Sequence, residues 1–214
     1  MARRAETVIL AAGDFPPRGS EAFAALASAK RVVCCDGAAK AYMRRMKRPP
    51  CAIVGDFDSW RGKIPEGTIA VRVAEQETND LEKAVMFCRS RGWTNPVILG
   101  ATGKRDDHSL GNVFRAFALG LETLTSHGRF MPVEGKARIK TGVGAAVSVF
   151  ATDPSAKARS RGLVWPLDGV RFGNLYCATL NRTCAATVEI ETTKPLLVYV
   201  ASARSPRSSS TLRA

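Results

Sequence analysis

Long apolar runs are missing from this sequence of 214 residues. A membrane-spanning helix needs about 20 consecutive, mostly apolar residues, and no stretch of the sequence approaches that length. The N-terminus begins with basic residues, but the apolar segment that follows is too short for a signal peptide and has no cleavage site. We therefore expect a cytoplasmic protein that does not associate with membranes.

Paired cysteines are missing as well. The six cysteines stand at positions 34, 35, 51, 88, 177 and 184 and form no CxxC pair. This spacing argues against the common zinc motifs and against a disulfide framework. We expect these side chains to be reduced and buried as small hydrophobes, as is usual in the cytosol.

Acidic residues are too few to balance the basic ones: 19 Asp and Glu face 32 Lys and Arg, for a net charge of +13. Such an excess is compatible with nucleic-acid binding. However, no RNP aromatic motif, zinc knuckle or helix-turn-helix pattern accompanies the basic clusters, which lie at 40–48, 157–161 and 204–214. A basic enzyme with an anionic substrate accounts for the same charge. We expect no nucleic-acid partner, and a basic nucleic-acid-binding module remains a distant alternative.

The first 125 residues alternate between short apolar runs and helical patterns. The expected strands are 7–13, 31–37, 51–57, 69–73 and 96–103. The expected helices are 20–29, 37–47, 78–91 and 109–121. Continuous apolar strands that alternate with helices predict a parallel, Rossmann-like sheet covered on both faces, with ligands at the carboxyl ends of its strands. We assign residues 1–125 to an α/β catalytic domain.

The helix expected at 78–91 has the clearest boundaries. Thr78 is a suitable N-cap, and the carboxylates of Asp80 and Glu82 favour the positive end of the helix dipole. Gly92 then ends the helix.

After residue 125 the helical signal nearly disappears. Short, β-branched segments lie at 129–133, 137–141, 145–151, 162–167, 173–179, 186–192 and 196–201. They are separated by Gly, Pro and Asp, which predicts a small antiparallel β-sandwich or barrel over residues 126–203. The remaining segment, 204–214, is rich in Ser and Arg without apolar periodicity, and we expect a disordered basic tail.

Acidic residues recur at the ends of the expected strands. They are Asp36, Asp56, Asp58, Asp80, Asp106 and Asp107. A single Asp in such a place is usually a turn or capping residue. Several at one edge of a parallel sheet would repel one another unless a cation lies among them, and carboxylate oxygens are ligands that Mg²⁺ prefers. No His or Cys stands at metal-ligand spacing, and the sequence therefore predicts a magnesium site.

The segment GATGKRDDH at 100–108 resembles a phosphate-binding loop but is not a Walker motif. That motif has four residues between its first glycine and the Gly-Lys pair, whereas only Ala101 and Thr102 stand there. The glycines still let backbone N–H groups approach a phosphate, and Lys104 and Arg105 can neutralise its oxygens. Asp107 can reach the metal. His108 is expected to orient a hydrogen bond, and Asn112 to hold the loop.

Four segments resemble, in order and spacing, the motifs of the thiamin pyrophosphokinase family: CDGAAKAY, GDFDS, QETNDLEKA and GATGKRDDHSLGN. GLVWPL and ATVEIETTKPLLVYVA are similar to the family's C-terminal half, so the resemblance covers roughly residues 7–201. It implies transfer of a diphosphoryl group from ATP to the hydroxyethyl oxygen of thiamin, which gives thiamin diphosphate and AMP. It also implies a homodimer with its sites between subunits.

The resemblance assigns roles to individual residues. Catalysis and Mg²⁺ binding would belong to Asp56, Asp58, Asp80 and Asp107. In the implied mechanism one acid, Asp80 or Asp58, would take the hydroxyl proton, and the sequence does not choose between them. ATP binding would involve Asp36, Lys83, Thr102, Lys104, Arg105 and His108. Thiamin binding would involve Gln76 and Asn181.

Two departures from the family pattern concern the accepting alcohol. Leu180 stands where the family has the serine of a Ser-Asn pair, and Thr183 stands in a stretch where an aromatic residue is common. Neither departure concerns the residues expected to bind the diphosphoryl donor. The alternative acceptor is therefore another heteroaromatic alcohol, such as a hydroxymethylpterin.

Overall fold

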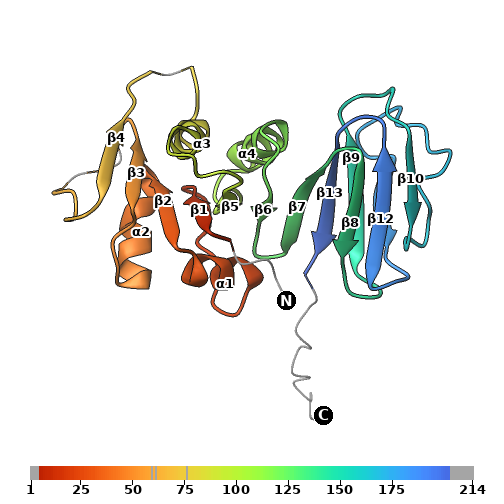
Figure 1. The fold of residues 1–214 in the computed structure, drawn as a ribbon, viewed down its shortest axis with the longest axis horizontal. Coiled ribbons are helices and arrows are strands. Elements are labelled where there is room, and N and C mark those ends of the chain that lie inside the picture. Colours follow the sequence, from red (N-terminus) through yellow and green to blue (C-terminus); the bar gives the residue numbers. More distant parts are fainter. Residues whose placement is uncertain (1–4, 59, 61, 76, 203–214) are drawn as a thin grey trace, which may run out of the picture. The chain divides into compact units, whose positions relative to one another are not determined.

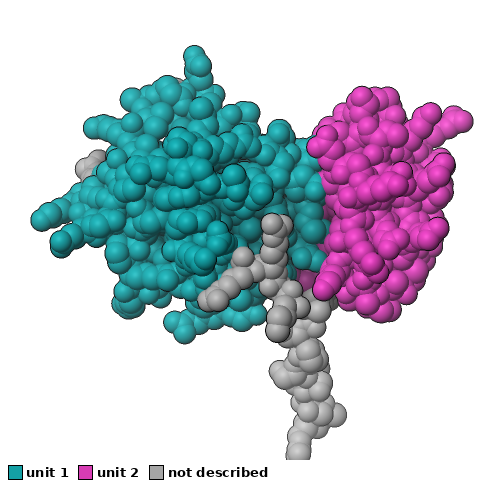
Figure 2. All heavy atoms as spheres, viewed as in Figure 1, with its two compact units in different colours: residues 1–132 teal, residues 133–214 magenta. Residues whose placement is uncertain are grey.

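The computed structural model describes residues 5–58, 60, 62–75 and 77–202, so Gln76 and the segment 204–214 lie outside the described residues. The chain forms two compact units, Met1–Pro132 and Val133–Ala214 (Figure 2). Each is described by itself below.

Unit 1 contains a mostly parallel sheet (Figure 1). Its strands are β1 (Thr7–Leu10), β2 (Arg31–Cys35), β3 (Ala52–Gly55), β4 (Ile69–Arg72), β5 (Val97–Leu99), β6 (Thr123–Leu124) and β7 (Gly128–Val133). Their order across unit 1 is β7-β6-β5-β1-β2-β3-β4. Every pair from β6 to β4 is parallel, and only β7 runs antiparallel to its neighbour β6. The parallel strands therefore end at one common edge.

Helices cover both faces of this sheet (Figure 1). They are α1 (Glu21–Ser28), α2 (Asp36–Met46), α3 (Asp80–Ser90) and α4 (Asp106–Ala118). Alternate residues of the strands feed two apolar cores: Ile9 and Val33 pack with α3 and α4, whereas Val8 and Val32 pack with α1 and α2. This arrangement confirms the α/β class and explains why the strands read as continuous apolar runs.

Two helix starts differ from the sequence prediction. Asn79, rather than Thr78, caps α3, because its Oδ1 accepts a hydrogen bond from the Glu82 N–H at 3.0 Å. Helix α4 starts at Asp106 instead of residue 109. Asp106, Asp107 and His108 thus occupy a first helical turn, where acidic side chains favour the helix dipole.

The paired strands of unit 2 are antiparallel. One set of strands is ordered β11-β9-β13 and the other β10-β12-β8. Their bounds are β8 (Lys136–Lys140), β9 (Ala146–Ala151), β10 (Ala158–Arg161), β11 (Ala178–Arg182), β12 (Thr187–Thr192) and β13 (Leu196–Ala201). Strands β9 and β12 alternate between buried and more exposed residues, as strands with one core-facing side do.

The strand predictions for unit 2 hold in part. The segment 162–167 is no strand and contributes only an isolated bridge between Leu163 and Thr183. The prediction at 173–179 meets a strand only at its end, where β11 begins. Strand β10 lies within the basic cluster KARSR, for which the sequence predicted no strand.

Over the described residues, no helix has the length and apolar character required to span a bilayer.

Candidate active site

Asp36 is placed at the carboxyl edge of the sheet by the turn from β2 into α2. It is only 3% exposed, and among the described residues its Oδ2 atom has no hydrogen-bond partner. Its carboxyl group lies against the end of β3, because a Cβ added to Gly55 would stand 3.0 Å from the Asp36 Cγ. The sequence thus brings a buried carboxylate into close contact with the backbone just before Asp56.

Asp80 stands in the first turn of α3 and faces the same region. Burial raises the pKa of Asp80 above its ordinary value, and the charges of Asp36 and Asp56 raise it further, whereas Lys83 acts in the opposite direction. The pKa of the buried Cys35 thiol is likewise raised, first by burial and then by the charges of Asp80 and Asp36. Asp36, Asp56 and Asp80 are therefore close enough to influence one another electrostatically.

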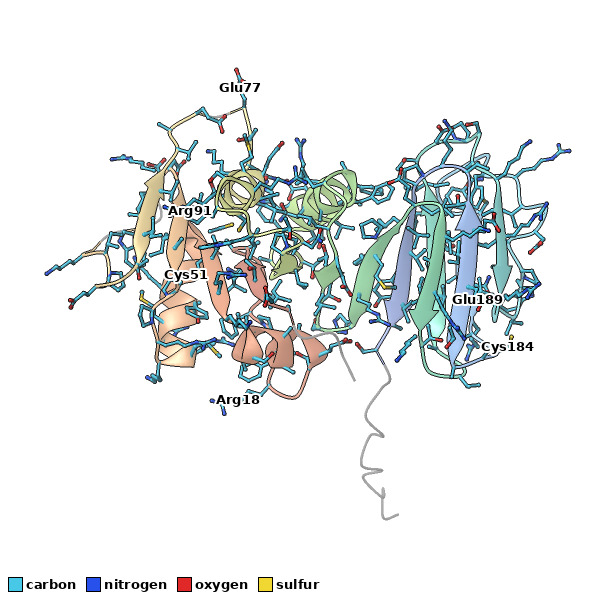
Figure 3. All side chains as sticks on the ribbon, viewed as in Figure 1. Arg18, Cys51, Glu77, Arg91, Cys184 and Glu189 are labelled. Carbon is cyan, nitrogen blue, oxygen red and sulfur yellow. The ribbon has the colours of Figure 1, made fainter. Side chains whose placement is uncertain are left out.

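Lys83 is the cation of this group. Its side chain is 4% exposed, and its Nζ lies 3.8 Å from the Asp80 Oδ1 and 4.0 Å from the Glu75 Oε1. The Glu75 carboxylate also accepts hydrogen bonds from the backbone of Glu77 at 2.7 Å and of Thr78 at 3.0 Å. Glu77 itself points away from the body of unit 1 (Figure 3). A buried ammonium between two carboxylates compensates part of their charge.

Asp56 and Asp58 follow β3 in a tight turn. The Asp58 N–H donates to the Asp56 Oδ1 at 3.0 Å, and Phe57 between them has a left-handed φ of 68°. Asp58 is exposed. The turn thus holds the Asp56 carboxylate toward the Asp58 backbone.

The glycine-rich loop after β5 packs on the segment that follows β1. The Gly13 N–H donates to the Gly100 carbonyl at 2.7 Å, and the Asp14 N–H donates to the Thr102 carbonyl at 2.7 Å. Gly103 has a φ of 87°, and an added Cβ would overlap the Asp14 carboxylate. Only glycine fits there, both for its φ and for its space.

The side chain of Asn112 holds this loop, as the sequence predicted. Its Nδ2 donates to the Ala101 carbonyl at 3.1 Å, and its Oδ1 accepts from the Asn79 Nδ2 at 3.3 Å. These two bonds tie the loop to α4 and to the N-cap of α3. The starts of both helices are therefore fixed at the same edge of the sheet.

The two basic residues of the loop have different partners. Lys104 has a φ of 59°, and its Nζ donates to the Ala12 carbonyl at 2.5 Å. Arg105 binds the exposed Asp107 through Nε at 3.1 Å and Nη2 at 2.6 Å, which lowers the pKa of Asp107 to about 2. His108 is exposed and Thr102 is half-buried.

The structure thus brings together Asp36, Asp56, Asp80 and Lys83. Asp58 contacts Asp56 through its backbone N–H, and Asp107 is paired with Arg105. Two further acids went unnoticed in the sequence: Glu75, which pairs with Lys83, and Asp14, which packs on the glycine-rich loop. Asp14 directly follows the expected strand at 7–13, so the strand-end pattern that marked the other acids could have found it.

The described part of the chain contains no group of three or more His, Cys, Asp or Glu side chains that is ready to hold a metal ion. The donor chemistry nevertheless fits Mg²⁺. The buried Oδ2 atom of Asp36 has no hydrogen-bond partner in that part of the chain, and Asp56 and Asp80 supply further carboxylate oxygens nearby. A divalent cation would offset their mutual repulsion.

Asn181 lies in β11 of unit 2 and is 6% exposed. Its amide bonds the backbone of Trp165 in both directions, with Nδ2 donating to the carbonyl at 2.6 Å and Oδ1 accepting from the N–H at 3.3 Å. Its neighbour Leu180 is 87% exposed and has a left-handed φ of 61°. Thr183 is buried.

Comparison with protein families gives two matches that together span most of the chain. Residues 24–124 match the catalytic domain of thiamin pyrophosphokinase, and residues 128–199 match its substrate-binding domain. The chain has no significant match among curated proteins.

Solved structures show the same fold. A thiamin pyrophosphokinase family protein from Enterococcus faecalis is similar with a TM-score of 0.76 at 16% identity, covering 94% of this chain and 100% of that one. The enzyme from Bacillus subtilis gives 0.71 at 16% identity, with 93% and 99% covered. The enzyme from Candida albicans gives 0.71 at 14% identity, with 92% and 89% covered.

Proposed function

The chain belongs to the thiamin pyrophosphokinase family, and from this membership we propose that it transfers a diphosphoryl group from ATP to the hydroxyethyl oxygen of thiamin. The products are thiamin diphosphate and AMP. The enzyme works in the cytoplasm, where its six free cysteines stay reduced.

The observation that carries this proposal is the charge arrangement at the carboxyl edge of the sheet. Asp36, Asp56 and Asp80 repel one another there, and Lys83 compensates only part of their charge. Parallel sheets bind ligands at this edge. A site of this kind suits a nucleotide that arrives with a divalent cation.

Asp36, Asp56 and Asp80 would hold Mg²⁺, and Asp58 and Asp107 complete the proposed set. When bound, the metal polarises the phosphoryl oxygens and neutralises the charge that develops on them.

The chain's own residues position the phosphates. Lys83 provides a buried positive charge beside the acids. Lys104 and Arg105 provide exposed charges beside the glycine-rich loop and the N-terminus of α4, where backbone N–H groups favour anions. These groups stabilise the transition state by position and charge.

The hydroxyl proton of the acceptor goes to a carboxylate, Asp80 or Asp58. Asp36, Thr102 and His108 line the ATP side of the proposed site, whereas Gln76 and Asn181 belong to the thiamin side. We further propose a homodimer in which unit 2 of one subunit completes the site of the other.

The test is an assay of both products. The protein is incubated with ATP, Mg²⁺ and thiamin, and the nucleotide and thiamin products are separated and identified. AMP with thiamin diphosphate is the expected result, and omission of Mg²⁺ should abolish it. ADP would contradict diphosphoryl transfer. AMP formed only with a hydroxymethylpterin would move the acceptor to that alcohol, and salt-sensitive nucleic-acid binding without turnover would favour the binding-module alternative.

A further inference from the structure

The side-chain amide of Asn181 is almost fully occupied by backbone partners. Its Oδ1 accepts from the N–H of Trp165 at 3.3 Å and from the N–H of Arg182 at 2.7 Å, and its Nδ2 donates to the Trp165 carbonyl. A carboxamide oxygen has two lone pairs, and both are used here. Because the residue is also buried, little of this amide is left for a ligand.

The segment that Asn181 holds presents a large aromatic ring. Leu163 and Leu167 are 4% and 1% exposed and anchor its two ends, whereas Trp165 between them is 59% exposed. The Leu167 N–H also donates to the Ser160 Oγ at 2.9 Å. Asn181 therefore fixes the backbone of this segment at the residue whose side chain faces outward.

Asn181 also ends an irregularity in its own strand. The pairing of β11 with β9 shifts register between Ala178 and Asn181, and Leu180 stands within that shift. Such bulges turn a side chain away from the regular pleat. The side chains of Leu180 and Trp165 are both exposed, and both residues adjoin the buried amide of Asn181. Leu180 precedes Asn181 in the chain, and Trp165 is hydrogen-bonded to it.

We infer that Asn181 is a positioning residue for the acceptor: it orients Trp165 and does not itself touch the acceptor's ring. The inference rests on the proposed function. The thiazolium ring of thiamin is a flat cation, and the face of an indole attracts cations more strongly than other aromatic side chains do. A tryptophan whose backbone is held at both its N–H and its carbonyl loses little conformational freedom when such a ring stacks on its indole.

A double-mutant cycle tests this inference. Asn181→Ala and Trp165→Ala should each raise the KM for thiamin by about tenfold, while kcat and the KM for ATP stay within about twofold. The double variant should have the same KM as Trp165→Ala, because the amide acts through the indole. Hydrogen exchange of the Trp165 amide should accelerate in Asn181→Ala.

Thr193→Ala is the matched control. It also removes a side-chain acceptor from a backbone N–H in unit 2, that of Lys157 at 3.0 Å, and should leave the KM for thiamin unchanged. If the increases in the KM for thiamin of Asn181→Ala and Trp165→Ala multiply in the double variant, Asn181 contacts the acceptor directly and the inference is overturned. Unchanged exchange at Trp165 would overturn it too. If the wild type makes no thiamin diphosphate, the proposed function fails, and this inference fails with it.

Discussion

Neutralising Asp80 should separate activity from stability. Asp80→Asn removes a charge from the proposed metal site, so turnover should fall by about a hundredfold or more, which corresponds to about 2.7 kcal/mol of activation free energy. The free energy of unfolding should not fall. The two measurements are steady-state formation of thiamin diphosphate and urea unfolding of the metal-free protein.

The expected stability change follows from the charges around Asp80. At an effective dielectric constant of about 20, charges 3.8 Å apart attract by about 4 kcal/mol, which is the gross attraction of Lys83. Solvent reduces it strongly, because the Asp80 side chain is 36% exposed. Burial and the charges of Asp36 and Asp56 outweigh it, since the pKa of Asp80 is raised. We expect the variant to be more stable by about 0–1 kcal/mol at pH 7.

The pH dependence has a definite sign. A carboxyl group with a raised pKa binds its proton more tightly in the folded protein, so its favourable contribution is complete below the ordinary value of 3.8. That contribution is lost as the pH rises through the folded pKa. The stability of Asp80→Asn relative to the wild type should therefore increase from acidic to neutral pH, and Mg²⁺ should raise the Tm of the wild type more than that of the variant.

Asp153→Asn is the matched control. Hydrogen bonds from Ser155 lower the pKa of this partly exposed carboxyl, so its loss should decrease stability at neutral pH and leave turnover unchanged. The reasoning would be refuted if Asp80→Asn lost more than about 1 kcal/mol of stability at pH 7 but kept its turnover. Asp80 would then be a structural residue at the start of α3.

Three other substitutions or mixtures test different parts of the structure. Gly103→Ala should lower the free energy of unfolding by about 1–3 kcal/mol, because Gly103 has a left-handed φ and an added Cβ would meet Asp14. Gly111→Ala is the control: it lies in α4 with open space around it and should raise the free energy of unfolding by about 0.5–1 kcal/mol. Equal effects of the two substitutions in urea unfolding would argue against the tight loop. Leu180→Gly should stabilise the protein by about 1 kcal/mol, since it relieves a left-handed leucine that is 87% exposed; a loss of stability would mean that Leu180 is covered in solution. Asp80→Asn and Asn181→Ala, refolded together in equal amounts and assayed well below the KM for thiamin, where both variants are weakly active, should recover activity in mixed dimers, with about a quarter of all sites intact; activity no higher than their average, with mixed dimers present, would exclude a shared site.

Much of unit 1 was predictable because its signals are repeated. Continuous apolar strands between helices indicate a parallel sheet, and a parallel sheet gathers its strand ends at one edge whatever the loops do. Asp36, Asp56 and Asp80 were therefore expected near one another without any knowledge of side-chain geometry. The start of α4 was missed because Arg105 at its N-cap position makes no side-chain capping bond, so only the two acids of the first turn marked it.

Unit 2 was less predictable because a loop held by two buried leucines and a strand have similar sequence patterns. Leu163 and Leu167 are buried and Trp165 between them is exposed, an apolar segment that suggested a strand although only one bridge forms. The partner of Asn181 could not be predicted either. It lies 16 residues away in the chain, and its bonds are to backbone atoms that have no sequence signature.

The net charge of +13 and the acidic edge of unit 1 are compatible parts of one electrostatic arrangement. Most of the basic excess lies elsewhere, for example in α2, whose last turn carries Arg44 and Arg45. A positive protein attracts a polyanionic nucleotide over distance. Close to the sheet, however, Asp36, Asp56 and Asp80 repel phosphates that come without a cation. On the proposed function, the overall charge speeds the encounter with ATP, and the local acids select the form of ATP that carries Mg²⁺.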